Sequence, residues 1–413
     1  MKTLLVLGAG TAGTMIAKKM AKKLDSRDWK VILVDKDPNH YYQPGFLFIP
    51  FGKYGEKDVI RKNKQYIPSN IEYILSDIEM IEPDASQVRL TLDNRVILYD
   101  YLVIATGCDI RPEETEGMLD GWRKDIFDFY TYDGSVALQK YLNNWQGGRL
   151  VVNVVENPIK CPVAPLEFLF LADWVFTQRG MRDKVELVYA TPLTGAFTKP
   201  VSSVMLGDIL VKKNIKMETE FNAGSVDAEK KILSSYDERE IPYDLLVSVP
   251  VNMGSDLIKR SGMGDSLNFI PTDNETLQSS KYQNIWVLGD ATNIPASKAG
   301  AVIHFQLGVV EENLLAAIHG KELHAKFDGH SSCYIESGFN KGILIDFSYN
   351  QEPLPGTYPI PGIGPFSLLK ESFINHMGKM GFKYLYWELM LRGIEVPLPS
   401  KFSMAGKVQP KYK

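Results

Sequence analysis

The feature that most constrains this chain is a glycine-rich turn near the N-terminus that joins a short apolar run to a helical pattern. Residues 3–7 (TLLVL) lead into Gly8-Ala9-Gly10-Thr11-Ala12-Gly13, which has the pattern G-x-G-x-x-G. Residues 14–24 then have the spacing of an amphipathic helix, and residues 29–35 form a second apolar run that ends in an aspartate. This order predicts a βαβ unit with a buried parallel sheet.

The same turn predicts a dinucleotide-binding site. Glycines allow a tight turn, a close backbone approach to a pyrophosphate and close packing of helix on strand, while the helix N-terminus faces the negative charge. Asp35 ends the next strand 22 residues after Gly13, where a carboxylate can bind ribose hydroxyls. Because strand, helix and terminal acid accompany the glycines, we interpret Gly8, Gly10, Gly13 and Asp35 as binding residues rather than as a turn without a ligand.

Two later signatures bear on which dinucleotide is bound. Ala105-Thr106-Gly107 ends one apolar strand, and Gly289-Asp290 ends another. With the glycine turn, they resemble the signatures of flavoproteins with two dinucleotide-binding domains, the class that includes glutathione reductase. The resemblance implies that the cofactor is FAD, bound in part by Ala105, Thr106, Gly107, Gly289 and Asp290.

A second phosphate-binding loop is missing. Residues 148–155 (GRLVVNVV) predict the first strand of a new unit, but the chain continues as Glu156-Asn157-Pro158-Ile159-Lys160-Cys161-Pro162. A loop punctuated by proline cannot supply the glycine backbone that a nicotinamide pyrophosphate needs. The sequence therefore argues against NAD(P)H as the electron donor.

The three cysteines are too few for a disulfide framework but suffice for one redox pair. Cys161 occupies the position of the missing phosphate loop, just before Pro162 and a helical stretch. We expect it near a helix N-terminus, where the dipole and Lys160 would favour a thiolate. Cys333 lies 172 residues later, and Cys108 follows the Ala-Thr-Gly signature and is interpreted as a bystander. Taken singly, a cysteine is more often an inert small hydrophobe.

Five further stretches carry a more specific resemblance. They are 160–165 (KCPVAP), 333–349 (CYIESGF to IDFSY), 40–44 (HYYQP), 297–298 (SK) and 386–393 (YWELMLRG). Together they resemble sulfide:quinone oxidoreductases and the related flavocytochrome c sulfide dehydrogenases over nearly the whole chain. The resemblance implies that sulfide attacks an oxidised Cys161–Cys333 pair, leaving a persulfide on one cysteine, and that two electrons pass through FAD to a quinone.

The resemblance also implies roles for four more residues. Pro44 and Lys298 join the FAD site, Glu167 is a candidate acid or base, and Lys298 and Lys379 are candidates for stabilising reduced flavin or polarising the quinone. A solvated helix glutamate and ordinary surface lysines are the alternatives. Residues 113–160 contain neither cysteine nor histidine, unlike some bacterial relatives, so proton transfer at the sulfide site is left open.

The C-terminal segment is basic and amphipathic. Residues 361–413 contain eight lysines and arginines against three glutamates, interleaved with methionine and aromatic residues. Such helices are typical of a bilayer interface, although a helix pair packed on the protein core is the alternative. The resemblance favours a monotopic anchor and quinone entrance. Because apolar rings suit a quinone head, the candidate contacts are Tyr334, Phe347, Tyr349 and Phe382.

These patterns predict an α/β fold with two Rossmann-like dinucleotide-binding domains and a C-terminal amphipathic helical membrane-anchor segment. We expect an FAD-binding domain from residues 1–112 and 271–325 and a second Rossmann-like, substrate domain at 113–270. A C-terminal hairpin with amphipathic helices is expected at 326–413.

Charge and the N-terminus narrow the partners. With 46 Lys and Arg against 50 Asp and Glu, the chain has no overall field to attract nucleic acid. The N-terminus shows no n-region, h-region or cleavage site, and no stretch of 18 residues is wholly apolar. We therefore expect peripheral membrane association without an export signal or a spanning helix. No metal site is predicted, and homo-oligomerisation is left open.

Three alternatives to a sulfide:quinone oxidoreductase remain at this point. A sulfide dehydrogenase with a cytochrome acceptor would share the cysteine chemistry, but it is disfavoured by the anchor-like tail. A non-pumping NADH:quinone oxidoreductase would share fold and anchor, but it is disfavoured by the missing phosphate loop. A flavin-bearing sulfur carrier would hold a persulfide without passing electrons to a quinone.

Overall fold

The βαβ unit at the N-terminus forms the centre of the first of two parallel sheets in the computed structural model, which describes residues 1–394 and 401–409. Strand β1 (Lys2–Leu7), helix α1 (Thr11–Lys23) and strand β2 (Trp29–Asp35) follow one another, and β1 pairs in parallel with β2 and with β9 (Tyr101–Ile104). The strand order is β20-β9-β1-β2-β5, with β20 (Ile285–Val287) and β5 (Glu72–Leu75) at the edges. The predicted parallel sheet is confirmed.

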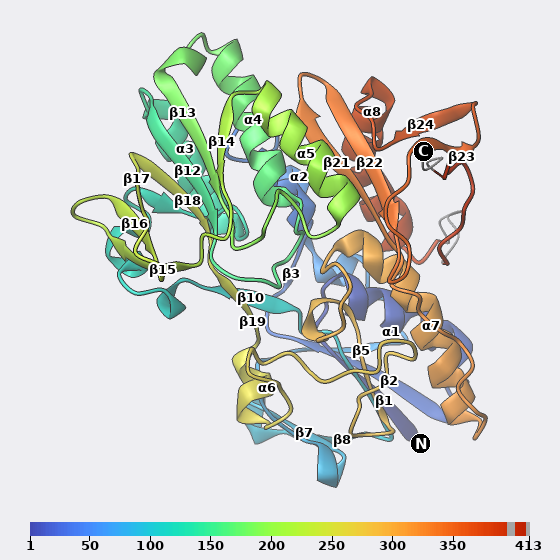
Figure 1. Ribbon diagram of the computed structural model, residues 1–413. Coiled ribbons are helices and arrows are strands. Elements are labelled where there is room, and N and C mark those ends of the chain that lie inside the picture. The colour runs from blue at the N-terminus through green and yellow to red at the C-terminus, as the bar shows by residue number, and fades with distance from the viewer. Residues whose placement is uncertain (395–400, 410–413) are drawn as a thin grey trace.

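A second parallel sheet repeats this arrangement. Its order is β11-β18-β12-β13-β14, so the first strand of its βαβ unit, β12 (Gly148–Val154), again lies in the middle. The other strands and the helices of this unit are β11 (Ile126–Phe127), β13 (Val185–Ala190), β14 (Ile215–Glu218), β18 (Leu245–Val249), α3 (Tyr132–Asn144), α4 (Ala164–Gln178) and α5 (Pro200–Lys212). Figure 1 shows the two sheets joined by the antiparallel pair β10 (Cys108–Arg111) and β19 (Val251–Gly254).

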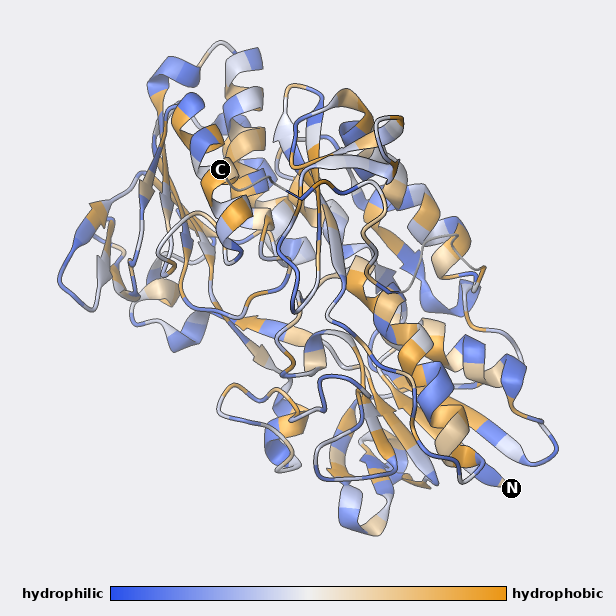
Figure 2. Ribbon diagram, turned by 45° about the vertical axis from the view of Figure 1, so that its right-hand side comes forward, coloured by the Kyte–Doolittle hydropathy of each residue, from blue (hydrophilic) through white to orange (hydrophobic). Residues whose placement is uncertain are grey.

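The strands of the first sheet are buried on both faces, which explains why they are continuously apolar. Leu4 and Val6 belong to the core cluster that contains the residues of α1 and of α7 (Gly300–Ile318), whereas Leu5 and Leu7 belong to the cluster of the small sheet β6-β7-β8. That sheet consists of β6 (Ile78–Glu82), β7 (Gln87–Leu90) and β8 (Val96–Leu98). In the hydropathy colouring of Figure 2, hydrophobic residues accordingly predominate along these parallel strands.

The second sheet is covered in a similar way. Its helices α3 and α4 pack on one face, and a small antiparallel sheet shares a core cluster with the other face. This small sheet consists of β15 (Ala223–Asp227), β16 (Ile232–Ser235) and β17 (Glu240–Pro242).

The C-terminal part begins with the hairpin that the sequence predicts. Strands β21 (Ser331–Gly338) and β22 (Lys341–Phe347) pair antiparallel, with Cys333 opposite Ile345. β24 (Gly364–Leu368) and β23 (Gly356–Ile360) extend the sheet in the order β21-β22-β24-β23, which leaves β21 at an edge. Helix α8 (Phe373–Leu385) and a π-helical turn at Tyr386–Met390 follow.

Helix α7 is the one helix of the described residues that is long and apolar enough, by length and composition, to cross a membrane. It packs against α1 and β21, and 56% of its most apolar window is buried inside the fold. These contacts are those of a core helix that links the first sheet to the hairpin.

The structure corrects part of the prediction for the C-terminal segment. Tyr386 and Trp387 are 1% exposed and Leu391 is fully buried, so these residues belong to the core rather than to a lipid-facing surface. The Tyr386 hydroxyl bonds to Nε2 of His40 at 2.6 Å and to Oγ1 of Thr11 at 2.7 Å. These partners lie in the first domain, far away in the sequence. The charges of Glu395, Lys411 and Lys413 lie outside the described residues.

Candidate active site

One large cavity lies where the first sheet, helix α4 and the β21–β22 hairpin meet. Its volume of about 690 Å³ falls within the range of roughly 300–1,000 Å³ found for cofactor and ligand sites. Ten of the eleven residues predicted for the cofactor line it: Gly8, Gly10, Asp35, Pro44, Ala105, Thr106, Gly107, Gly289, Asp290 and Lys298. The structure thus brings the separate sequence signatures together.

The glycine turn has the geometry that a dinucleotide requires. Gly8 has a φ of +95°, which favours glycine, and a Cβ there would clash with the carbonyl oxygen of Ala105. A Cβ on Gly13 would clash with the carbonyl oxygen of Gly8, so Gly13 serves close packing and does not line the cavity. A Cβ on Gly10 would meet nothing within 4 Å. This open space lies at the N-terminus of α1, where a pyrophosphate is stabilised.

Polar groups around the turn also fit a bound dinucleotide. Asp35 accepts hydrogen bonds from the backbone N–H groups of Ala9 and Asp37, which fix its carboxylate at the cavity wall. Burial raises the pKa of Asp35 and that of Asp290, although Lys298 and Lys160 oppose the rise at Asp290. The buried hydroxyl of Thr106 has no hydrogen-bond partner among the described residues. A ligand in the cavity would satisfy it.

Lys298 connects the cofactor site to Cys161. Its ammonium donates to the carbonyl oxygens of Asp290 at 3.0 Å and Thr292 at 2.5 Å, and it lies 3.9 Å from the centre of the Phe269 ring. Burial lowers its pKa. The carbonyl oxygen of Lys298 accepts the N–H of Cys161 at 2.7 Å. Lys298 is therefore a buried, fixed side chain and not the surface lysine considered as the alternative.

Cys161 and Cys333 line the same cavity, although they come from the loop before α4 and from β21. Cys161 has a φ of 44°, a left-handed conformation that costs a non-glycine residue about 1–3 kcal/mol and that clusters at functional sites. Its carbonyl oxygen accepts the N–H of Ala164 at 2.9 Å and the hydroxyl of Tyr130 at 3.3 Å. The surrounding structure thus holds this cysteine in a fixed orientation.

The prediction of a thiolate at Cys161 is wrong for this structure. Burial raises the pKa of the Cys161 thiol well above its ordinary value, and the Glu167 carboxylate raises it further, while Lys379 opposes both. Burial likewise raises the pKa of Cys333 to about 12. Helix α4 begins three residues after Cys161, and Lys379 rather than Lys160 is the nearby cation. Both cysteines are free thiols.

Glu167 and Lys379 form a buried ion pair beside the two cysteines. Nζ of Lys379 lies 2.7 Å from Oε1 of Glu167, and the Glu167 side chain is 0% exposed, so a solvated glutamate and a surface lysine are both excluded. Burial would lower the pKa of Lys379, but Glu167 and the cysteines raise it to about 12. Lys379 therefore carries its charge at neutral pH.

The edge strand β21 supports this ion pair with backbone groups that no neighbouring strand uses. Lys379 donates to the carbonyl oxygen of Tyr334 at 3.0 Å, and Glu167 accepts the N–H of Glu336 at 2.6 Å. Three segments, α4, β21 and α8, are thereby held around the cysteines.

The four predicted quinone contacts divide into two pairs. Tyr334 and Phe382 line the cavity. Phe347 and Tyr349 do not: Phe347 is buried in the core beside Lys199, and the Tyr349 hydroxyl donates to the carbonyl oxygen of Asn274 at 3.3 Å. This second pair thus lies outside the cavity, and aromatic character alone does not tell which face of a strand or loop a ring occupies.

Two residues that sequence reasoning missed also line the cavity. Nε2 of His330 lies 2.7 Å from Oδ1 of Asp346, and both side chains are buried. The hairpin register places Asp346 opposite Ser332, two residues after His330. This pairing could have been derived from the predicted hairpin, since the side chains of 330, 332 and 334 share one face.

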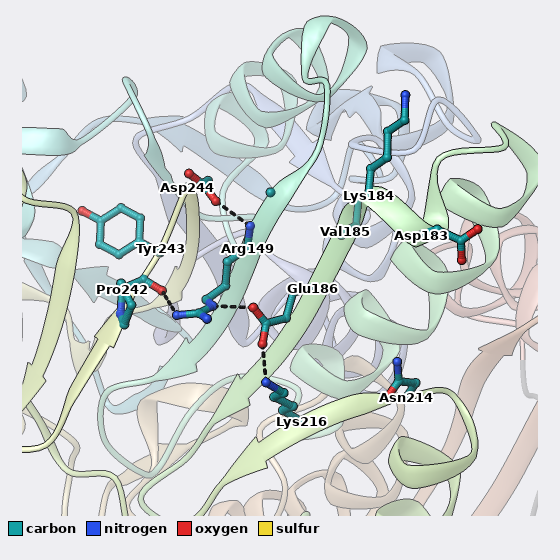
Figure 3. Close-up of a pocket in the computed structure, with 11 residues that line it drawn as sticks. Arg149, Asp183, Lys184, Val185, Glu186, Asn214, Lys216, Pro242, Tyr243 and Asp244 are labelled. Atoms are coloured by element: carbon teal, nitrogen blue, oxygen red, sulfur yellow. Dashed lines mark hydrogen bonds and ion pairs between the residues drawn. The ribbon is translucent and has the colours of Figure 1, made fainter.

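A second pocket of about 520 Å³ lies away from the cysteines, at the end of the second sheet where β12, β13 and β18 begin (Figure 3). Three of its charged groups, Arg149, Glu186 and Lys216, pair with one another. Glu186 lies 2.6 Å from Nε of Arg149 and 2.5 Å from Nζ of Lys216. None of the predicted site residues lines it, so the cavity at the cysteines is the candidate active site.

Comparison with known proteins finds relatives over nearly the whole chain. Residues 2–152 match the family model of the pyridine nucleotide-disulphide oxidoreductases. The chain is 29% identical over 397 residues to the mitochondrial sulfide:quinone oxidoreductase of Mus musculus, covering 94% of this chain and 86% of the relative. It is 28% identical, with the same coverage, to the mitochondrial enzyme of Dictyostelium discoideum. The solved sulfide:quinone oxidoreductase of Aquifex aeolicus has the same fold, with a TM-score of 0.78 at 22% identity over 95% of this chain and 92% of that one.

Proposed function

This chain belongs to the sulfide:quinone oxidoreductase family, its cofactor is FAD, and from that premise we propose that it oxidises sulfide at Cys161 and Cys333 and transfers the electrons to a quinone. One observation carries the proposal. Two cysteines 172 residues apart in the sequence line the same cavity as the dinucleotide-binding signatures, next to a buried cation.

The cysteine pair supports a balanced first step. Hydrosulfide attacks one sulfur of the oxidised Cys161–Cys333 pair, the S–S bond breaks, and the attacked cysteine becomes a persulfide while the other leaves as a thiolate. A buried thiolate is costly without a compensating charge. The ammonium of Lys379 supplies that charge, because its pKa of about 12 keeps it protonated beside both sulfurs.

Glu167 positions Lys379 in this step and is also the candidate base. Its Oε1 holds Lys379, and its Oε2 has no hydrogen-bond partner among the described residues although it lines the cavity. Burial raises the pKa of this carboxyl, which brings its proton exchange closer to neutral pH and suits a group that takes the proton of the incoming sulfide.

Bound FAD would supply a two-electron carrier between the cysteines and a quinone. The chain holds it through the glycine turn, Asp35, the Ala-Thr-Gly segment and Asp290, all of which line the cavity. Lys298, fixed against Asp290 and Thr292, places a cation near this site and stabilises negative charge that develops there.

An apolar surface next to the cavity supports membrane association. Ile363, just before β24, is 79% exposed. On helix α8, Phe373 is 61% exposed and Met377 is also exposed. Other residues of α8 and of β24, including Phe382 and Phe366, line the cavity. A quinone could thus pass from a bilayer to the cavity past α8.

Exchanging Phe373 and Met377 for glutamate should abolish sedimentation with anionic lipid vesicles and leave the FAD content unchanged.

An anaerobic absorbance titration tests the proposed function. Sulfide should bleach the flavin of the purified holoenzyme, and a short-chain quinone should restore its absorbance. A flavin that sulfide reduces but quinone does not reoxidise would indicate a cytochrome acceptor or a sulfur carrier. A flavin that sulfide leaves oxidised would refute the proposal.

A further inference from the structure

We infer that His330 binds one carbonyl oxygen of the quinone and donates one of the two protons that quinone reduction requires. The inference rests on the proposed function, and it names the group that would protonate the acceptor. His330 and its partner Lys407 lie outside every motif by which the sequence predicts the site, and Asp346 lies within the 333–349 stretch without a role assigned to it there.

His330 is fixed on the cavity wall with one ring nitrogen unused. The side chain is 8% exposed, and its ring stacks on Phe305 with centres 3.9 Å apart and planes inclined by 18°. Nε2 donates to Oδ1 of Asp346 at 2.7 Å. Nδ1 is buried and has no hydrogen-bond partner among the described residues. Such a group is normally satisfied, and here the cavity is where a ligand can satisfy it.

Asp346 determines which nitrogen is free. Its Oδ2 binds the ammonium of Lys407 at 2.5 Å, and the Lys407 side chain is fully buried, so the carboxylate has little freedom. Because Oδ1 holds the hydrogen on Nε2, Nδ1 accepts a hydrogen bond when the ring is neutral and donates one when it is protonated. The charged and titratable groups around the ring are Asp346, Lys407, Asp328 and Tyr358. The carboxylate of Asp328 accepts the backbone N–H of His330 at 3.0 Å.

The histidine and the reactive cysteine lie on opposite faces of the hairpin. Side chains alternate along a strand, so Cys333 and its neighbours Ser332 and Tyr334 point in opposite directions. Cys333 faces Cys161 and Glu167. Tyr334 faces α8, where its ring would contact a Cβ on Gly378, and it packs edge-on against Phe366.

Ser332 and Tyr334 pair with Asp346 and Leu344 of β22, and all four residues line the cavity. His330 bonds to Asp346 on this face. The cavity therefore contains a protonatable group on the face of the hairpin opposite the Cys333 side chain.

Quinone reduction balances with His330 as one proton donor. The quinone takes up two electrons, which the proposed function supplies through reduced FAD, and two protons. The imidazolium of His330 transfers the Nδ1 proton to one carbonyl oxygen and becomes neutral, while Nε2–H stays bonded to Asp346. The other carbonyl oxygen takes its proton from water, and a solvent proton recharges His330.

The variant His330→Gln keeps a hydrogen-bond donor but removes proton exchange. In anaerobic stopped-flow experiments on the sulfide-reduced holoenzyme, reoxidation by a short-chain quinone should slow about 10²-fold or more, the contribution typical of a general acid. Flavin reduction by sulfide should be unchanged. Reoxidation by ferricyanide, which takes electrons without protons, should also be unchanged.

Two further readouts separate proton donation from a structural role. Equilibrium binding of a non-reducible quinone analogue to the oxidised holoenzyme, followed by flavin fluorescence, should weaken in His330→Ala and persist in His330→Gln. The exposed His324, exchanged in the same way for glutamine, serves as the matched control and should behave as wild type. If His330→Gln loses its FAD, the variant Asp346→Asn is used instead. This change favours the wrong tautomer of His330 and should slow the quinone step alone.

Slowing of quinone and ferricyanide reoxidation to the same extent, or no slowing of either, would overturn the inference. These outcomes differ from a failure of the proposed function. In that case the wild-type flavin would itself not be reduced by sulfide, or not be reoxidised by quinone.

Discussion

The two parallel sheets both have the first strand of a βαβ unit at their centre, but the loops that follow these strands differ. In the first sheet, β1 leads to α1 through a turn that contains Gly8 and Gly10, and in the second, β12 leads to α4 through a loop that carries Pro158, Cys161 and Pro162. Both loops follow the carboxyl end of the central strand, where such folds bind their ligands. One position in the fold thus presents open backbone to a pyrophosphate, and its counterpart presents a thiol.

Hydrogen bonding in the second loop explains why it cannot replace the first. The N–H of Lys160 is bound to the side chain of Asn252, and the N–H of Cys161 is bound to the carbonyl oxygen of Lys298. Ala164 donates its N–H back to Cys161. These donors orient the cysteine and are not free for an anion. The comparison teaches that the loop, and not the sheet, decides whether this position of the fold can hold a pyrophosphate.

The largest expected effect comes from removing the thiol of the second loop. Cys161→Ser should slow flavin reduction by sulfide by at least about 10⁴-fold, because the loss of a nucleophile from a coupled pair removes most of the rate. FAD content should remain normal, because this change leaves the glycine turn intact. Cys108→Ser is the matched control and should be reduced as wild type. A large defect in that variant would show that the wrong pair was assigned. Stopped-flow absorbance measures both.

Breaking the ion pair beside this loop should be the next largest effect. Lys379→Met leaves Glu167 buried without its partner and should lower the free energy of unfolding by about 3–5 kcal/mol. Because the pKa of Lys379 is raised from 10.5 to about 12, the stability it contributes is present below pH 10.5 and is lost as the pH rises through 12. Denaturant unfolding at pH 8 measures the change.

The exposed pair of Lys230 and Asp227 provides the control for that variant. Lys230→Met should leave stability unchanged, because exposed ion pairs contribute little. Equal losses in the two lysine variants would contradict a special role for the buried pair.

The first loop should respond to acid through His40, which has no counterpart in the second. Nδ1 of His40 donates to the carbonyl oxygen of Ala9 at 3.0 Å, and burial lowers the pKa of this histidine to about 4. A lowered pKa means that the unfolded chain binds the proton more tightly below pH 6.5. Stability should therefore fall by about 3 kcal/mol as the pH drops from 6.5 to 4. A His40→Gln variant with an equally steep pH dependence of unfolding would contradict this assignment.

The smallest effect concerns the packing of the glycine turn. Gly13→Ala forces a methyl group against the carbonyl oxygen of Gly8 and should cost about 1–3 kcal/mol of stability, with a lower FAD content. Gly308→Ala in α7 is the control, because its Cβ would meet nothing within 4 Å. The ratio of flavin to protein absorbance, with the melting temperature, measures both variants.

Much of the fold follows from local patterns. The glycine turn, the apolar strands and the hairpin at residues 331–347 were predictable, because period and turn residues act locally. The position of Tyr386 was not predictable, because its burial depends on hydrogen bonds to His40 and Thr11, more than 340 residues away in the sequence.

The sequence predicted which residues line the cavity better than it predicted their protonation. Family resemblance selected Cys161, Cys333, Glu167 and Lys379, and the structure brings these four residues to one cavity. The protonation of Cys161 was mispredicted, because a helix N-terminus and a neighbouring lysine are local signals, whereas burial is a tertiary property. His330 lies outside the sequence motifs, and only the hairpin register, which pairs Ser332 with Asp346, brings it beside that carboxylate.

The central claim is that the second loop delivers electrons from sulfur rather than from a nicotinamide. The most direct test is an anaerobic titration of the holoenzyme with sulfide and, separately, with NADH, following the flavin absorbance. The account predicts complete bleaching by sulfide, with two electrons taken up per FAD, and none by NADH. Bleaching by NADH with no response to sulfide would contradict it.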